Sequence, residues 1–156
     1  MTELLTRCGA YTYFGAHPAE AGYVFRVWAP HARAVALAGD FNGWQPAAMQ
    51  RLDGGVWELT QPDAKVYDGY KYVVTGADGQ TVWKADPYAF HAATRPGTDS
   101  KVYDIGGYDW HDGGWQEKRR AQPPVNGPLL IYEVHLGSWR RHGDGTSLSY
   151  RELARE

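Results

Sequence analysis

Carboxylates and imidazoles are the side chains of this 156-residue chain that could carry out acid–base chemistry. Glu133 and His135 are two positions apart in a predicted strand, so their side chains point the same way, and a buried polar pair explains them better than catalysis. The sequence has neither a Cys–His cluster with metal-ligand spacing nor a glycine-rich phosphate loop. We therefore predict no catalytic residue, no metal site and no cofactor. Most aspartates fall in turn sequences, which explain them: Asp53, Asp63, Asp68, Asp78, Asp99, Asp109 and Asp112.

Aromatic side chains carry more information about binding. The chain has seven Trp and eleven Tyr but only four Phe, and rings with a polar end serve both cores and wet binding surfaces. The formal net charge of -2 argues against nucleic acid, which usually needs a basic face, and fits an uncharged partner such as a sugar.

The compartment is predicted from what the sequence lacks. A stretch of about 18 apolar residues, as a membrane span needs, does not occur, and the N-terminus lacks the basic start and apolar core of a signal peptide. Cys8 is the single cysteine, so an intramolecular disulfide is impossible and we read Cys8 as a spectator thiol. These features predict a cytoplasmic protein without a membrane partner.

Short strands separated by many turns predict an all-β domain, because 19 Gly and nine Pro accompany the aromatic residues. The turn at Gly39–Trp44 is predicted from Asn42-Gly43, which tolerates positive φ. Trp28 and Trp57 are expected to pack in the core or between sheets. The predicted strands span residues 23–28, 34–38, 56–60, 69–75, 80–84 and 101–105.

A hairpin between two of these strands allows a sharper prediction. A three-residue loop, Ala77-Asp78-Gly79 with Gly79 left-handed, pairs Val73 with Trp83. Since side chains alternate along a strand, Trp83 then lies beside Lys71 and on the face opposite Tyr72. A two- or four-residue loop would place Trp83 on the tyrosine face instead.

The C-terminal part has a different pattern. Residues 113–128 are rich in Gly and Pro and are predicted to be a linker, in which the 117–120 charge run forms a turn or a single helical turn. Residues 129–136 are apolar with little alternation, as in strands buried on both faces of a parallel sheet. Ser149 and Glu152 have the spacing of a helix capping box. Strand, loop and helix start together indicate the opening of a β/α unit.

These segments resemble a known family. Gly22 to Pro30, the Gly39–Trp44 turn, Tyr70-Lys71-Tyr72 and Lys84 to Phe90 resemble the N-terminal carbohydrate-binding module, family 48, of bacterial glycogen branching enzymes. Residues 131–141 and 148–154 resemble the start of the catalytic (β/α)8 barrel of these enzymes, which belong to the α-amylase superfamily (glycoside hydrolase family 13). The stretch His135-Leu136-Gly137-Ser138-Trp139 is the more specific part of the likeness.

The resemblance implies a fold and a domain organisation. It implies an immunoglobulin-like β-sandwich over residues 1–112, whose first ten or so residues form a tail, then a linker over 113–128 and an incomplete barrel start over 129–156. A complete barrel needs roughly 250 residues. Trp110, Trp115 and Trp139 are expected near the seam between sandwich and barrel.

The resemblance also implies a function. Branching enzymes cut an α-1,4-glucan and rejoin the piece through an α-1,6 bond by retaining chemistry on two carboxyl groups. The family carries those carboxyl groups on later barrel strands, so this chain is expected to be inactive alone. Its partners are then an α-1,4-glucan (glycogen, amylose or maltooligosaccharides) and the remainder of the barrel.

The same resemblance nominates a binding site. In related glycogen-binding modules of kinase regulatory subunits, the residues that match Trp44, Lys71 and Trp83 contact sugar, and an Asn stands where this chain has Ser100. Two rival interpretations remain open: a stand-alone glucan-binding module, and a sandwich that makes only protein contacts.

Overall fold

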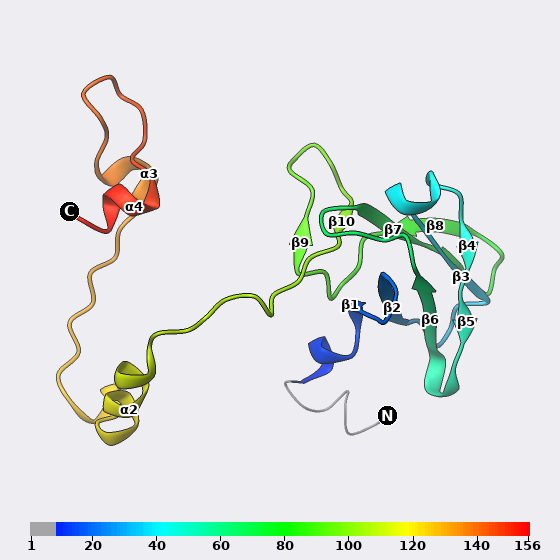
Figure 1. Ribbon diagram of the computed structural model, residues 1–156, viewed down its shortest axis with the longest axis horizontal. Helices are drawn as coiled ribbons and strands as arrows, with labels where there is room; N and C mark the ends of the chain where they lie inside the picture. The colour runs from blue at the N-terminus through cyan, green and yellow to red at the C-terminus, as the bar shows by residue number, and fades with distance from the viewer. Residues whose placement is uncertain (1–8) are drawn as a thin grey trace. The chain divides into compact units, whose positions relative to one another are not determined.

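The computed structural model describes residues 9–156, so Cys8 lies outside the described residues. The chain divides into two compact units between Tyr108 and Asp109. The first unit is a sandwich of two antiparallel sheets, and the second contains short helices joined by irregular segments (Figure 1).

One sheet has the strand order β1-β2-β6-β5. The pairing of β2 with β6 sets Val27 opposite Trp57, so that both side chains point into the space between the sheets. The strands are β1 (Gly15–Pro18), β2 (Tyr23–Trp28), β6 (Val56–Gln61) and β5 (Gln50–Arg51).

The other sheet has the order β4-β3-β7-β10-β9, and β8 also pairs with β7. Both β8 and β10 pair with β7, at different positions along it. β10 pairs at Gly69 and Tyr70, and β8 pairs from Tyr72 onward. The strands are β4 (Ala47–Ala48), β3 (Ala34–Gly39), β7 (Gly69–Thr75), β10 (Ser100–Lys101), β9 (His91–Ala92) and β8 (Thr81–Lys84). Short 3-10 helices connect them: η1 (Ala10–Thr12), η2 (Asp40–Asn42) and η3 (Asp53–Gly55).

The core lies between the two sheets. Phe25 of β2 meets Tyr70 of β7 edge to face, with ring centroids 4.9 Å apart. Met49, between β4 and β5, is buried at the point where the chain passes from one sheet to the other. The buried members of the core cluster are Ala16, Phe25, Val27, Ala32, Val35, Leu37, Met49, Trp57, Ala64, Tyr70, Tyr72 and Val102.

The predicted all-β sandwich is confirmed, and five of the six predicted strands are present with ends shifted by at most one residue. The predicted strand over 101–105 is wrong, since β10 ends at Lys101. Trp57 is buried as predicted, but Trp28 is 48% exposed. The alternation along β2 explains this, because Phe25 and Val27 face inward and Trp28 therefore faces outward.

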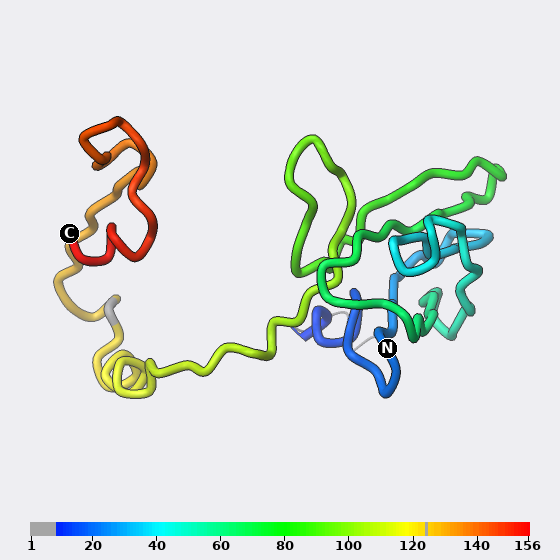
Figure 2. Tube along the Cα trace, turned by 45° about the horizontal axis from the view of Figure 1, so that its top comes forward, coloured from blue at the N-terminus to red at the C-terminus, as the bar shows by residue number. Residues whose placement is uncertain are grey.

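The hairpin prediction is confirmed. The loop between Gly76 and Gln80 contains three residues, and Gly79 adopts the left-handed conformation with φ +80°. Val73 pairs with Trp83, which places Trp83 on the face of β7 opposite Tyr72. The loop that joins β9 to β10 also stands out from its sheet (Figure 2).

The second unit differs from the prediction in two places. Residues 113–121 of the predicted linker form a helix, and residues 129–135 contain no strand. The predicted capping box is confirmed, because the backbone N–H of Ser149 donates to Glu152 and that of Glu152 donates to the Ser149 hydroxyl. The helices are α2 (Gly113–Ala121), η4 (Pro124–Asn126), α3 (Leu136–Trp139) and α4 (Tyr150–Leu153). Within residues 9–156, no helix is both long enough and apolar enough to cross a membrane.

Candidate functional site

Trp44 is positioned by the turn that follows β3. The Asn42 side chain accepts a hydrogen bond from the Gly39 N–H and donates one to the carbonyl oxygen of Leu37, which fixes η2 against the strand. Gly43 and Trp44 then both take a left-handed backbone with φ +61°. For a bulky residue such as Trp this conformation is a strained outlier, and such strain gathers at functional sites.

Asp40 ties the Trp44 indole to the neighbouring strand. The indole Nε1–H donates to Asp40 Oδ1 at 2.8 Å, and the Gly69 N–H donates to Asp40 Oδ2 at 2.6 Å. A Cβ at Gly69 would lie 3.4 Å from Trp44 Cζ2, so the indole lies close over the strand. The indole N–H is bonded to Asp40 and is not available to a ligand, and Trp44 as a whole is partly buried.

Trp83 completes a pair of indoles. Its side chain is 46% exposed on the outer face of the sheet, because β8 pairs Trp83 with Val73. The ring centroids of Trp44 and Trp83 are 6.4 Å apart, and the ring planes are inclined by 33°. The two rings therefore lie next to each other although their residues are 39 positions apart in the chain.

Lys71 lies on the same face of β7 as Val73 and hence on the side of Trp83. Its ammonium donates to the Thr98 hydroxyl at 2.6 Å and pairs with Asp99 at 3.3 Å, and the side chain is only 19% exposed. The lysine is therefore held in place by the β9–β10 loop. Ser100, which we predicted to stand where related modules have an Asn, is buried on the inner side of the sheet and accepts from the Asp86 N–H.

The structure thus brings together all three predicted residues, Trp44, Lys71 and Trp83, and adds Asp40, Thr98 and Asp99. Sequence reasoning missed the added residues. The Gly39–Trp44 turn carries a local signal for Asp40, because turn aspartates accept nearby N–H groups. Thr98 and Asp99 carry no such local signal. Their loop is held by β9 and β10, and strands of two residues leave no recognisable pattern in the sequence.

A polar cluster lies behind this surface, inside the sandwich. Asp86 is buried and accepts from the Tyr70 hydroxyl at 2.7 Å, the Tyr72 hydroxyl at 3.2 Å and the Tyr88 N–H at 2.8 Å. Burial raises the pKa of Asp86, and these hydrogen bonds oppose the shift only in part. Burial likewise raises the pKa of Tyr70 and of Tyr72. The cluster faces away from Lys71 and ties β7 to the 86–88 segment, which is a structural role.

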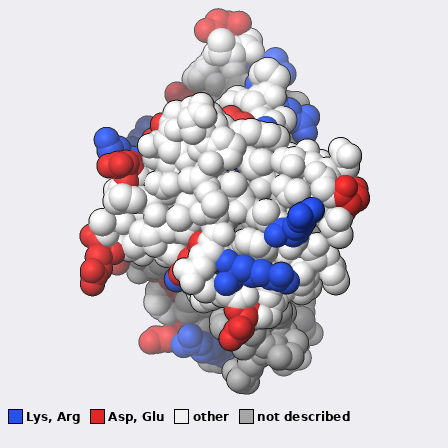
Figure 3. Space-filling model, turned by 90° about the vertical axis from the view of Figure 1, so that its right-hand side faces the viewer, with Lys and Arg blue, Asp and Glu red and all other residues white. Residues whose placement is uncertain are grey.

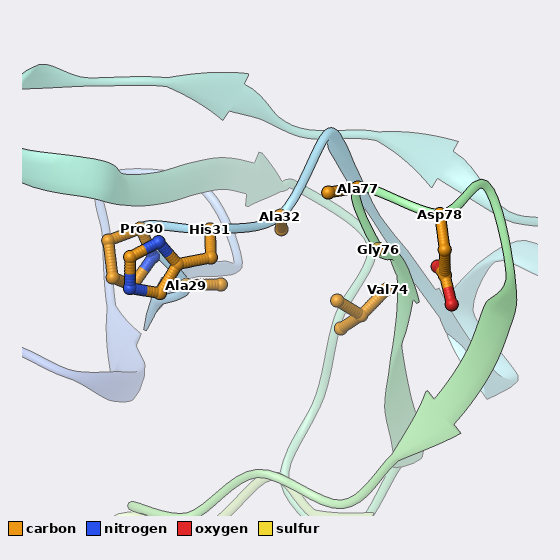
Figure 4. A pocket seen from close by; sticks show the side chains of 8 residues that line it. All are labelled: Ala29, Pro30, His31, Ala32, Val74, Gly76, Ala77 and Asp78. Atoms are coloured by element: carbon orange, nitrogen blue, oxygen red, sulfur yellow. The ribbon is translucent and has the colours of Figure 1, made fainter.

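The hollow in Figure 4 lies at one end of the sandwich, between the turn after β2 and the β7–β8 hairpin. Most of the residues that line it are small and apolar, with His31 and Asp78 as the polar members, and no Trp lines it. It is lined by Ala29, Pro30, His31, Ala32, Val74, Gly76, Ala77 and Asp78. On the molecular face in Figure 3, the upper middle is uncharged, basic side chains lie across the lower middle, and acidic side chains lie mostly toward the edges. Residues 9–156 contain no group of three or more His, Cys, Asp or Glu side chains that could hold a metal ion.

Comparison with known proteins shows which family the sandwich resembles. Residues 13–89 match the family model "Carbohydrate-binding module 48 (Isoamylase N-terminal domain)". The chain is 45% identical over 152 residues to the 1,4-alpha-glucan branching enzyme GlgB of Bacillus subtilis (strain 168), an alignment that covers 93% of this chain and 24% of that protein. The chain therefore spans about a quarter of the length of this relative.

Solved structures give the same result for the fold. A pullulanase complexed with maltotriose from Anoxybacillus sp. LM18-11 is 25% identical with a TM-score of 0.55, over 69% of this chain and 15% of that chain. The maltotriose complex of PulA from Klebsiella pneumoniae is 27% identical with a TM-score of 0.51, over 58% of this chain and 11% of that chain. Residues 13–89, which include β1 to β8, therefore belong to carbohydrate-binding module family 48, and the chain as a whole is similar to the N-terminal region of 1,4-α-glucan branching enzymes.

Proposed function

We propose that this chain binds α-1,4-glucan on the surface made by Trp44, Lys71 and Trp83, which we name the indole platform. In this proposal the chain is the N-terminal, glucan-recognising portion of a glycogen branching enzyme of the cytoplasm. The enzyme as a whole transfers α-1,4-linked segments to α-1,6 positions, and this chain supplies recognition.

The chemistry of the platform suits a glucan. An α-glucan presents an apolar face of C–H groups and a rim of hydroxyls. The tilted indoles, 6.4 Å apart, offer flat apolar area to consecutive sugar rings. Lys71 supplies a charged donor on the same face, and Thr98 supplies a hydroxyl beside it.

The observation that carries the proposal is the indole pair on one outer sheet face, in which Trp83 is exposed and Trp44 is partly buried. An exposed Trp83 beside a strained Trp44 has no packing explanation inside the sandwich, since the core lies on the other side of β7. A platform of this kind buries little area, so a single contact is weak, and affinity grows when several sites engage one polymer.

Glycogen retardation in native gels, with maltoheptaose titration, tests the proposal. The 156-residue chain should be retarded by glycogen, and Trp44→Ala or Trp83→Ala should weaken binding about fivefold or more, as truncation of a central interface aromatic does. Lys71→Ala should weaken it less, because Lys71 already has protein partners. The matched control is Trp28→Ala, which removes an exposed indole from the other sheet. Equal retardation of all four variants and the parent chain would refute the indole platform.

A further inference from the structure

A second aromatic group lies beside the indole platform. Tyr67, just before β7, meets His91 of β9 edge to face at 5.6 Å and Tyr103 at 5.7 Å, and the rings of His91 and Tyr103 lie 5.3 Å apart. The Lys101 ammonium lies 6.0 Å from the Tyr67 ring centroid. We name these four residues the tyrosine cluster.

Tyr67 is held in an unusual conformation. Its backbone is left-handed, with φ +75°, and its N–H donates to the carbonyl oxygen of Val102 at 2.8 Å. The side chain is nevertheless 56% exposed, so core packing does not require it. Within residues 9–156, only Trp44 shares this combination of a non-glycine residue and positive φ. Strain of this kind persists where the surrounding structure enforces it, and it gathers at ligand-binding positions.

The tyrosine cluster and the indole platform share one face of the sheet. Lys101 pairs with both Gly69 and His91, and Lys71 lies two residues after Gly69, so the side chains at these positions point the same way. Gly69 has no side chain, and the Trp44 ring fills the space above it. Tyr67 lies in the turn that precedes β7, four residues before Lys71 in the chain.

The tyrosine cluster has the groups that a sugar hydroxyl rim requires. His91 Nδ1 donates to the carbonyl oxygen of Ala92, so Nε2 is the ring nitrogen left to meet a sugar hydroxyl. Lys101 adds a donor, and the two phenol hydroxyls can donate or accept. The tyrosine cluster therefore has the same two features as the indole platform, which are an exposed aromatic ring and hydrogen-bonding side chains next to it.

We propose that the tyrosine cluster is a second glucan-binding site, which takes sugar units of the same α-1,4-glucan chain that lie beyond those on the indole platform. This inference rests on the proposed function, and it adds a chain-length preference. A short oligosaccharide occupies the indoles alone, whereas a longer one also reaches Tyr67 and gains affinity from the second contact.

Tyr67→Gly is the informative substitution. Glycine accepts the left-handed backbone, so the variant removes the ring without adding backbone strain, and its thermal unfolding midpoint should stay close to that of the parent chain. Affinities of the 156-residue chain for maltotriose and maltoheptaose are compared by titration. Tyr67→Gly should weaken maltoheptaose binding about fivefold and leave maltotriose binding unchanged.

Two further variants separate this inference from the proposed function. Trp44→Ala should weaken binding of both oligosaccharides, whereas Trp28→Ala on the other sheet should weaken neither. If Trp44→Ala acts as expected while Tyr67→Gly binds maltoheptaose like the parent chain, the second site is overturned and the indole platform stands. Equal loss for both oligosaccharides in Tyr67→Gly would also overturn it, because the ring would then serve the first site. No effect of Trp44→Ala on either oligosaccharide would refute the proposed function itself.

Discussion

The β-sandwich and the C-terminal unit treat similar apolar residues in opposite ways. Leu37 of β3 is fully buried, whereas Leu130 is 97% exposed and Ile131 is 81% exposed. Every sandwich strand pairs with neighbours inside residues 9–108, and its alternating side chains meet those of the second sheet. Residues 129–135 form no strand, and no side chain described between residues 109 and 156 is buried. An alternating strand needs one packed layer, but an apolar run without alternation needs cover on both faces.

Truncation of a core ring should give the largest difference between the two regions. Phe25→Ala should lower the free energy of unfolding by about 3–5 kcal/mol, because it leaves a cavity where Tyr70 and Phe41 contact the ring. Leu130→Ala should change it by less than about 0.5 kcal/mol. Urea unfolding, followed by near-ultraviolet circular dichroism, measures both. If the sandwich variant cannot be purified folded, Phe25→Leu provides a milder truncation with an intermediate loss.

A comparable loss of unfolding free energy from Leu130→Ala would contradict this contrast between the two units. It would mean that the exposed residues 129–135 contribute to folding. Met49→Ala offers a second core probe at the point where the chain passes between the sheets. It should resemble Phe25→Ala in sign but cost less, because the removed side chain is smaller.

The same contrast explains how far the fold could be predicted. Strands of four or more residues, such as β2 and β7, show their alternation in the sequence and were predicted with nearly correct ends. Strands of two residues, such as β5 and β10, are too short for a period to be visible, and they exist because longer strands present free edges to them. The 129–135 run has a strand-like composition, but composition does not supply partner strands.

The candidate site was predictable to the extent that it depends on local geometry. The hairpin register followed from Gly79 and alternation alone, and it placed Trp83 beside Lys71. The contacts of Lys71 with Thr98 and Asp99 join residues 27 and 28 positions apart, through a loop held by β9 and β10. Such contacts depend on tertiary packing, which no spacing in the sequence encodes.

Removal of a turn aspartate should give a smaller difference in the free energy of unfolding between the two regions than removal of a core ring. Asp40→Ala should lower the free energy of unfolding by about 1–3 kcal/mol, because the buried Gly69 N–H loses its acceptor, and it should weaken glucan binding because the Trp44 indole loses its anchor. Asp144 also accepts two hydrogen bonds, but both come from Thr146, two residues away. Asp144→Ala is therefore the matched control, which should change the free energy of unfolding far less than Asp40→Ala and leave glucan binding unchanged.

A double-mutant cycle shows whether Asp40 affects glucan binding through the Trp44 indole or through the strand at Gly69. In a Trp44→Phe background the ring has no N–H for Asp40 to accept, so Asp40→Ala should cost less affinity for maltoheptaose than it does in the parent chain. Equal costs in both backgrounds would show that Asp40 acts on the site through the strand at Gly69 and not through the indole.

The smallest expected effect is a dependence on pH, in which an aspartate of each unit acts with opposite sign. Burial raises the pKa of Asp86 above its ordinary 3.8, so the folded state binds this proton more tightly than the unfolded chain. The resulting stabilisation is fully present below pH 3.8 and is lost as the pH rises through the raised value. Hydrogen bonds from Thr146 lower the pKa of Asp144, whose contribution is present above pH 3.8 and is lost as the pH falls through the lowered value.

Asp86→Asn isolates the sandwich contribution, because Asn cannot ionise and its amide can still accept from the Tyr88 N–H and donate to the Tyr70 hydroxyl. The free energy of unfolding of the parent chain, minus that of Asp86→Asn, should fall as the pH rises from 4 to 7, because only the parent chain must then bury a charge. Urea titrations at several pH values give this difference, in which the other titrating groups cancel. A difference that rises with pH would mean that the hydrogen bonds of the two tyrosines outweigh burial at Asp86. The polar cluster would then stabilise a buried carboxylate. Hydrogen bonds would in that case lower the pKa of Asp86 in the sandwich as they lower that of Asp144 in the C-terminal unit.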